Sequence, residues 1–193
     1  SARHATGDLD GAIADYTKAI ELDPSHARAL AGRGALLVRR SGGSAAARGL
    51  DRAIELDPDQ PEYLVDRGIV RELRGDREGA VHDFGRAIAL DGACSVALRH
   101  RAALRLLEGD LAGARADLDR AIEVAPGDAE TRRQRALVAE QQGDLGAAIA
   151  DLGAAIELVP DRAEWLLARA RLRFEAGDRA GALDDLDRAL GLE

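Results

Sequence analysis

A segment of 18 residues returns along this chain at a constant interval of 34 residues. It reads "GDLDGAIADYTKAIELDP" at its first occurrence, and a degraded copy, "SGGSAAARGLDRAIELDP", begins at Ser41. The clear copies begin at Gly7, Gly75, Gly109, Gly143 and Gly177. Such a period identifies a repeat architecture, in which each unit buries its apolar face only by stacking on its neighbours.

Each copy carries the start, the interior and the end of a helix. Asp8 stands where a side chain can accept a hydrogen bond from the free amides of a first helical turn, and the glycine before it suits a left-handed turn. Ile13, Tyr16 and Ile20 follow at helical spacing, and Pro24 ends the segment. We therefore predict that the recurring segment is one helix of each unit.

The residues between two copies predict the other helix of the unit. Asp59-x-x-Glu62 and Asp161-x-x-Glu164 resemble capping boxes that open such a helix. Two helices per unit give an all-α fold of twelve helices without strands. The first of them is expected to be short, because Ser1 falls past its middle.

Small residues occupy three fixed positions of the repeat. The first helix of each full unit carries Gly34, Gly68, Ala102, Ala136 and Ala170 at one of them. The second helix has alanine at the other two, among them Ala80 with Ala87 and Ala148 with Ala155. This pattern resembles the tetratricopeptide repeat family, and the resemblance covers nearly the whole chain.

The resemblance implies an α-α superhelix of antiparallel helix pairs that forms a single domain over residues 1–193. Its repeats would cover residues 1–26 (partial), 27–60, 61–94, 95–128, 129–162 and 163–193. The motif is a packing signature, so it indicates the fold and says little about a ligand.

Composition narrows the classes of partner. The chain has 27 Lys and Arg against 35 Asp and Glu, a net charge of −8, which disfavours nucleic acid as a partner. Lys18 is the only lysine, and this preference for Arg indicates GC-rich, bacterial coding. No apolar run is long enough to cross a membrane. Cys94 is the only cysteine, which fits a reducing compartment, so we expect a cytoplasmic protein without excluding the periplasm.

Residues of catalytic chemistry do not converge anywhere in the sequence. The histidines His4, His26, His82 and His100 fall in four different parts of the repeat, so they do not predict a metal site. No phosphate loop or nucleophile motif occurs. We expect no catalytic, cofactor-binding or metal-binding residues, and a protein that is not an enzyme.

Arginine and aspartate recur at matching positions of the repeat. The arginines are Arg33, Arg67, Arg101, Arg135 and Arg169, and the aspartates are Asp15, Asp83, Asp117, Asp151 and Asp185. We predict ion pairs between neighbouring units, Asp15–Arg33, Asp83–Arg101, Asp117–Arg135 and Asp151–Arg169. Gly49 interrupts the aspartate series, so it should leave Arg67 without a partner and weaken the second unit.

In this family the first helices line a concave groove, and the resemblance places a candidate binding surface there. Arg99, Arg133 and Arg171 fall in successive first helices. The neighbouring candidates are His100, Leu106, Gln134, Leu137 and Phe174. We expect an acidic segment or a free carboxylate as ligand. The alternative is that these arginines pair with Glu130, Glu140, Glu164 or Glu175 on the same face.

The leading functional hypothesis is a scaffold that holds a peptide or helical segment of another protein in the groove. One alternative is a structural scaffold that self-associates through its uncapped ends, where Leu183, Leu186 and Leu190 are expected to be exposed, or covered by missing sequence or by a second copy. Another is the regulatory repeat domain of a larger protein.

Overall fold

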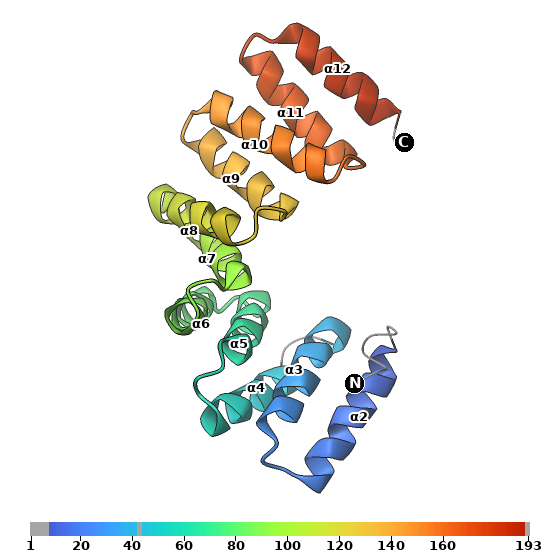
Figure 1. Ribbon diagram of the computed structural model, residues 1–193, viewed down its shortest axis with the longest axis vertical. Coiled ribbons are helices and arrows are strands. Elements are labelled where there is room, and N and C mark those ends of the chain that lie inside the picture. The colour runs from blue at the N-terminus through green and yellow to red at the C-terminus, as the bar shows by residue number, and fades with distance from the viewer. Residues whose placement is uncertain (1–7, 42–43, 192–193) are drawn as a thin grey trace. The chain divides into compact units, whose positions relative to one another are not determined.

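The computed structural model describes residues 8–41 and 44–191. Over these two ranges the chain forms eleven α-helices and no strand. The helices are α2 (Leu9–Leu22), α3 (Ala27–Ser41), α4 (Ser44–Leu56), α5 (Pro61–Leu73), α6 (Arg77–Leu90), α7 (Ser95–Glu108), α8 (Leu111–Val124), α9 (Ala129–Gln141), α10 (Leu145–Leu158), α11 (Ala163–Glu175) and α12 (Arg179–Leu190) (Figure 1). The short first helix expected from the sequence lies outside the described residues.

The chain divides into two compact units, residues 1–97 and 98–193, and the division falls inside α7. In the first unit α2 packs on α3, α3 pairs with α4, and α5 pairs with α6. In the second unit α9 pairs with α10 and α11 with α12, and each pair runs antiparallel (Figure 1). That residues 1–193 form one domain stays a prediction.

The second helix of each repeat begins as the sequence predicts. Asp8, Asp76, Asp110, Asp144 and Asp178 are the N-cap residues, and each carboxylate accepts a hydrogen bond from the amide three residues later. The glycines before the last four of these aspartates have positive φ angles of 79° to 87°. This left-handed backbone is cheap only for glycine, so the Gly-Asp turn ends one helix and caps the next.

The first helices start differently from the prediction. The N-cap residues of α5 and α11 are Gln60 and Arg162, and neither side chain caps its helix. The proposed capping boxes at Asp59 and Asp161 are therefore wrong by one residue of register. In α5 the start is set by Pro61, because its ring fixes a helical φ at the first helical position and needs no amide partner there.

The small residues lie where helices approach closely. Ala80, Ala87, Ala148 and Ala155 are completely buried on their second helices. A Cβ atom added to Gly68 would come within 2.6 Å of the Phe84 ring. The large ring on α6 therefore fits against α5 because position 68 has no side chain. The core is consequently built from Ala, Leu and Val layers, as expected of a repeat with few aromatic residues.

Gly49 belongs to the same class of close contact. A Cβ atom there would lie 3.1 Å from the backbone carbonyl oxygen of Leu30, which cannot move away as a side chain can. The glycine that the sequence marks as a weak point in α4 therefore also permits the approach of α3. Gly42 and Gly43, which replace the usual Gly-Asp turn of this repeat, lie outside the described residues.

The recurring arginines bind aspartates inside their own repeat. Arg67 donates from Nε and Nη2 to the two carboxylate oxygens of Asp83, at 2.8 and 2.7 Å. The same bidentate pairs are Arg101–Asp117, Arg135–Asp151 and Arg169–Asp185. The predicted pairs Asp83–Arg101, Asp117–Arg135 and Asp151–Arg169 are therefore wrong, and so is the prediction that Arg67 lacks a partner. The fourth predicted pair, Asp15–Arg33, stays a prediction. Each arginine joins the two helices of one repeat.

A second arginine, one helical turn after the first, joins three of these pairs. Arg105 donates from Nη1 to Asp117 at 2.8 Å and to the carbonyl oxygen of Gly113 at 3.2 Å. Arg71 and Arg173 make the equivalent contacts to Asp83 and Asp185. A buried carboxylate with three charge-assisted hydrogen bonds results in each of these repeats.

Contacts between repeats come from a different aspartate. The Nη1 atom of Arg135 donates to Asp119 of the preceding repeat at 2.9 Å, and Arg67 contacts Asp51 in the same way. The pKa of both guanidinium groups is raised, chiefly by the hydrogen bonds to the aspartate inside the repeat and further by the bond to the aspartate of the preceding repeat. Gly153 occupies the same position 34 residues after Asp119, so the repeat before that of Arg169 has no carboxylate to offer it there.

Candidate functional site

A pocket of about 390 Å³ opens on the second unit between α9, α10 and α11. It is lined by charged residues from two successive first helices and by apolar residues between them. The lining residues are Glu130, Arg133, Ala136, Leu137, Glu140, Leu152, Glu164, Trp165, Ala168 and Arg171. Three of the eight residues predicted as a partner site, Arg133, Leu137 and Arg171, are brought together here.

The two arginines of the pocket are held by glutamates on the same face. Arg133 donates from Nε to Glu130 at 2.9 Å, and this contact raises the pKa of its guanidinium group. Arg171 donates to Glu140 of the preceding first helix at 2.6 Å and to Glu175 of its own helix at 2.8 Å. The alternative expected from the sequence, a mosaic of paired charges, is the arrangement found.

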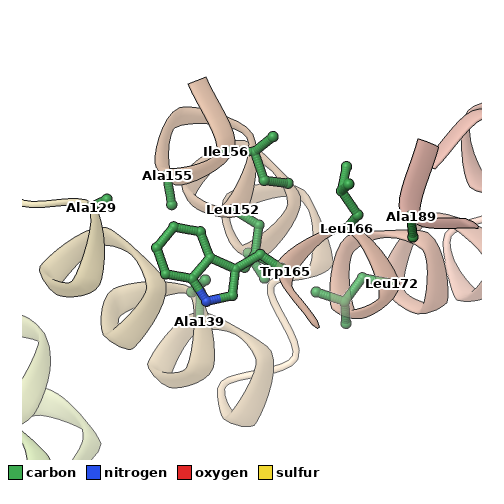
Figure 2. Close-up of a cluster of buried hydrophobic side chains, with 11 residues drawn as sticks. Ala129, Ala139, Leu152, Ala155, Ile156, Trp165, Leu166, Leu172 and Ala189 are labelled. Carbon is green, nitrogen blue, oxygen red and sulfur yellow. The ribbon is translucent and has the colours of Figure 1, made fainter. Parts of the chain in front are cut away.

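Trp165 forms the apolar part of the pocket, and sequence reasoning did not select it. Its ring lies against Leu152 and Ala155 of α10 and is almost fully buried (Figure 2). Arg162 stacks over the ring with its guanidinium carbon 5.6 Å from the centroid. The available signal was that Trp165 is the only tryptophan of the chain, at a position where the other repeats have Tyr or smaller residues.

The remaining predicted site residues lie outside this pocket. Arg99 forms an ion pair with Asp128, 3.4 Å apart. Leu106 is half-buried and packs against the buried cluster of Ala102, Ala114, Leu118 and Val138. Phe174 is well exposed, whereas His100 and Gln134 are half-buried. Of the three predicted arginines, the pocket thus contains Arg133 and Arg171.

Family models match three stretches of the chain, two of which overlap. Two models described as tetratricopeptide repeat match residues 65–129 and 106–173, and one described as TPR repeat matches residues 1–40. The chain belongs to the tetratricopeptide repeat family. The expected fold class, an α-α superhelix of antiparallel helix pairs, is confirmed with it. Proteins of this family are typically non-enzymatic scaffolds.

Solved structures of several tetratricopeptide repeat proteins share the fold. PilW, a type IV pilus biogenesis factor, has a TM-score of 0.84 and 20% identity over 95% of this chain and 85% of its own. MamA from Desulfovibrio magneticus RS-1 has a TM-score of 0.77 and 21% identity over 86% of this chain and 94% of its own. YrrB, described as having an unusual peptide-binding site, has a TM-score of 0.74 and 23% identity over 92% of both chains. A search of curated proteins gave no match.

A second, more polar pocket of about 730 Å³ lies on the first unit at the turns before α3 and α5. Asp23 accepts hydrogen bonds from the amide and hydroxyl of Ser25 there. Burial, followed by the charge of Asp57, raises the pKa of Tyr63 at its edge. Its lining is more polar than apolar, whereas the pocket between α9, α10 and α11 is divided about evenly, so the pocket on the first unit is a weaker candidate for a protein ligand.

Residues of catalytic or metal chemistry are scattered in the described part of the chain. Burial raises the pKa of the half-buried Cys94 thiol, which disfavours the reactive thiolate. No group of three or more His, Cys, Asp or Glu side chains within residues 8–41 and 44–191 is placed to hold a metal ion. Across the same residues, no helix combines the length and apolarity needed to cross a membrane. His4 lies outside them.

Proposed function

We propose that this tetratricopeptide repeat protein is an interaction scaffold that binds a segment of another protein in the α9–α11 pocket. The observation that carries the proposal is the pocket itself, in which an apolar surface from Leu137, Ala168 and Trp165 is bordered by fixed charges. Its volume suits one or two side chains of an extended or helical segment. A peptide-binding site in YrrB, a protein of similar fold, supports the same class of ligand.

The pocket is preorganised for binding. Trp165 is fixed by the surrounding core, and Arg133 and Arg171 are each held by at least one glutamate. Side chains that are already ordered lose little conformational entropy when a ligand arrives, so more of the contact energy becomes affinity.

The charges of the pocket favour a ligand that is not acidic. Its lining holds three carboxylates, Glu130, Glu140 and Glu164, against two guanidinium groups, Arg133 and Arg171. An acidic ligand would have to displace Glu130 or Glu140 from the arginines. In place of the acidic segment expected from the sequence, we therefore propose a ligand segment with an apolar anchor and a neighbouring Lys or Arg. The basic side chain would pair with the carboxylate that is in excess in the pocket.

Peptides displayed on phage test this function with the full chain. Panning should enrich peptides that combine an apolar anchor with a basic residue. Their affinity should fall at least about tenfold in Leu137→Glu, because a charge then occupies the apolar floor. Leu90→Glu, at a comparably exposed leucine of α6 that does not line the pocket, is the matched control and should leave binding unchanged. Enriched peptides that bind Leu137→Glu as well as the parent would refute the site.

Two neutral substitutions separate the possible charges of the ligand. Glu130→Gln should weaken a basic peptide, because it removes one carboxylate and leaves Arg133 without its partner. Arg133→Gln should strengthen the same peptide. An acidic ligand predicts the opposite sign for both variants, and that result would restore the original expectation.

A further inference from the structure

A groove of about 380 Å³ on the first unit is formed by residues of α2, α3 and α4, and α3 packs on both of the other helices (Figure 1). Within the described part of the chain its lining includes three arginines, Arg33, Arg40 and Arg48, and no carboxylate. We call it the arginine groove. It concentrates positive charge in a chain whose net charge is −8.

The equivalent groove of the next repeat has balanced charges. Its volume is about 330 Å³, and its charged lining residues are Arg67, Arg71, Arg74, Asp51 and Asp76. The completely buried Asp83 binds Arg67 through Nε and Nη2 and Arg71 through Nη1. Three guanidinium groups therefore meet three carboxylates in this repeat.

The arginine groove has lost all three of these carboxylates but keeps its positive charge. Thr17, Gly42 and Gly49 stand 34 residues before the three aspartates. Two of the arginine positions are retained, as Arg33 and Arg40. The repeat thus preserves the cations of a charge network whose anions are missing from the sequence.

The two aspartates within α2 do not replace the lost carboxylates. Asp10 accepts a hydrogen bond from Arg40 at 2.9 Å, but its side chain is 82% exposed and does not line the groove. Asp15 is also exposed, and it lies two residues from both Ile13 and Thr17, which line the groove. Residues two apart do not share a helix face, so Asp15 does not enter the groove beside them.

Apolar residues accompany the arginines. Ile13, Leu30 and Leu37 form an aliphatic wall of the groove, whereas the positions of Ile13 and Leu37 hold Ala47 and Arg71 in the next repeat. The volume of the groove is close to that of the α9–α11 pocket and suits the side chains of a protein segment better than a single small anion.

We infer that the arginine groove binds an acidic segment of another protein. One carboxylate of the segment accepts hydrogen bonds from Arg33, as Asp83 does from Arg67, and a second carboxylate pairs with Arg48. An apolar residue between them contacts the aliphatic wall. Arginine suits this role because its guanidinium group stays charged and its planar donors match a carboxylate. This groove belongs to the first unit and shares no lining residue with the α9–α11 pocket, so the inference does not depend on that pocket.

Thr17→Asp tests the missing carboxylate without any ligand. The new side chain takes the position from which Asp51 accepts a hydrogen bond of Arg67. It should raise the midpoint of urea unfolding, and the rise should disappear when Arg33→Gln is added. Thr17→Asn is the uncharged comparison and should give no such rise. If Thr17→Asp does not raise the midpoint, Arg33 already has its charge satisfied and the inference fails.

Panning of a random peptide library on the full chain carrying Leu137→Glu tests binding, because that change blocks the α9–α11 pocket. The enriched peptides should carry two acidic residues beside an apolar one. Their affinity for the parent chain, measured by fluorescence anisotropy, should fall as the salt concentration rises. Arg48→Gln should weaken binding at least about threefold, and Thr17→Asp at least about tenfold because it occupies the donors of Arg33. Arg52→Gln is the control, since Arg52 is an exposed arginine of α4 that pairs with Glu55 outside the groove.

Four results of the binding experiment would overturn the inference. The first is enrichment without acidic peptides, and the second is acidic peptides that bind Thr17→Asp as well as the parent chain. The third is displacement of the peptide by inorganic phosphate at a concentration where acetate has no effect, which would make the groove a phosphate site. The fourth is a dimer, seen by light scattering, that Thr17→Asp dissociates; a second copy would then supply the carboxylates. None of these results bears on the α9–α11 pocket, because that pocket is blocked during panning.

Discussion

Replacing Asp117 by alanine removes the acceptor from two arginines at once. Its carboxylate is almost completely buried and accepts from Arg101 at 2.8 and 2.6 Å and from Arg105 at 2.8 Å. Because guanidinium groups cannot lose their charge, both would remain as cations in a partly buried site. The repeat of α7 and α8 should be strongly destabilised.

The magnitude follows from the number of bonds and the access of water. Hydrogen bonds to charged groups contribute about 1.5–3 kcal/mol each, and breaking a buried ion pair costs about 3–5 kcal/mol. The Arg101 and Arg105 side chains retain 18% and 28% exposure, so water replaces part of the loss. We expect the free energy of unfolding to fall by about 3 kcal/mol.

Asp151→Ala is the matched control. Asp151 binds one arginine, Arg135, which keeps its bond to Asp119, and the second-arginine position of that repeat is Ala139. The loss should be near 2 kcal/mol, because one guanidinium loses two of its three bonds.

Urea unfolding followed by circular dichroism gives both losses, and hydrogen exchange shows whether they are local, as a repeat stack allows. In Asp117→Ala the fastest exchange should appear in α7 and α8. Equal losses in the two variants would show that the second arginine adds nothing. A loss below about 1 kcal/mol for Asp117→Ala would show that these pairs do not hold the two helices of a repeat together.

Three further predictions concern single positions. Gly153→Ala should stabilise α10 by about 0.5–1 kcal/mol through helix propensity, and Gly153→Asp should gain a further bond to Arg169, seen as a coupling energy lost when Arg169 is also replaced. Gly49→Ala should give no such gain in urea unfolding, because its Cβ would press on the Leu30 carbonyl. Burial, and then the charge of Glu62, raises the pKa of Asp66 to about 6. The folded state therefore holds this proton between pH 4 and 6 when the unfolded state has lost it, so Asp66 lowers stability as the pH rises through that window. Asp66→Asn should raise the free energy of unfolding at pH 7 and leave it unchanged at pH 3.5, as measured by urea unfolding at both values.

The sequence predicts the helices and their caps well because those features are local. The Gly-Asp turn places a left-handed residue directly before an N-cap, and both requirements act over a few residues. All four described turn glycines and all five aspartates take the predicted conformations and roles. The starts of α5 and α11 were misplaced because Asp59 and Asp161 resemble caps while the helix begins one residue later.

The candidate site was predicted only in part, because pairing between side chains depends on geometry that the repeat pattern does not contain. Arg133 and Arg171 were selected as free cations, yet Glu130 and Glu140 lie close enough to bind them. Leu106 was selected as a surface residue from its place in the helix, but it packs on a buried cluster. Trp165 was not selected, because the sequence does not show that one ring lies in the buried cluster and also borders a pocket.

The Arg–Asp pairs show a general limit of reasoning from a repeat. When arginines and aspartates each recur every 34 residues, the pattern does not show whether an arginine binds the aspartate before it or the one after it in the chain. Arg67 lies 16 residues before Asp83 and 18 residues after position 49, and a perfect repeat does not distinguish the two. Gly49 does distinguish them, because pairing with the preceding position of the aspartate series would leave Arg67 without a bidentate partner, and Arg67 has one in Asp83.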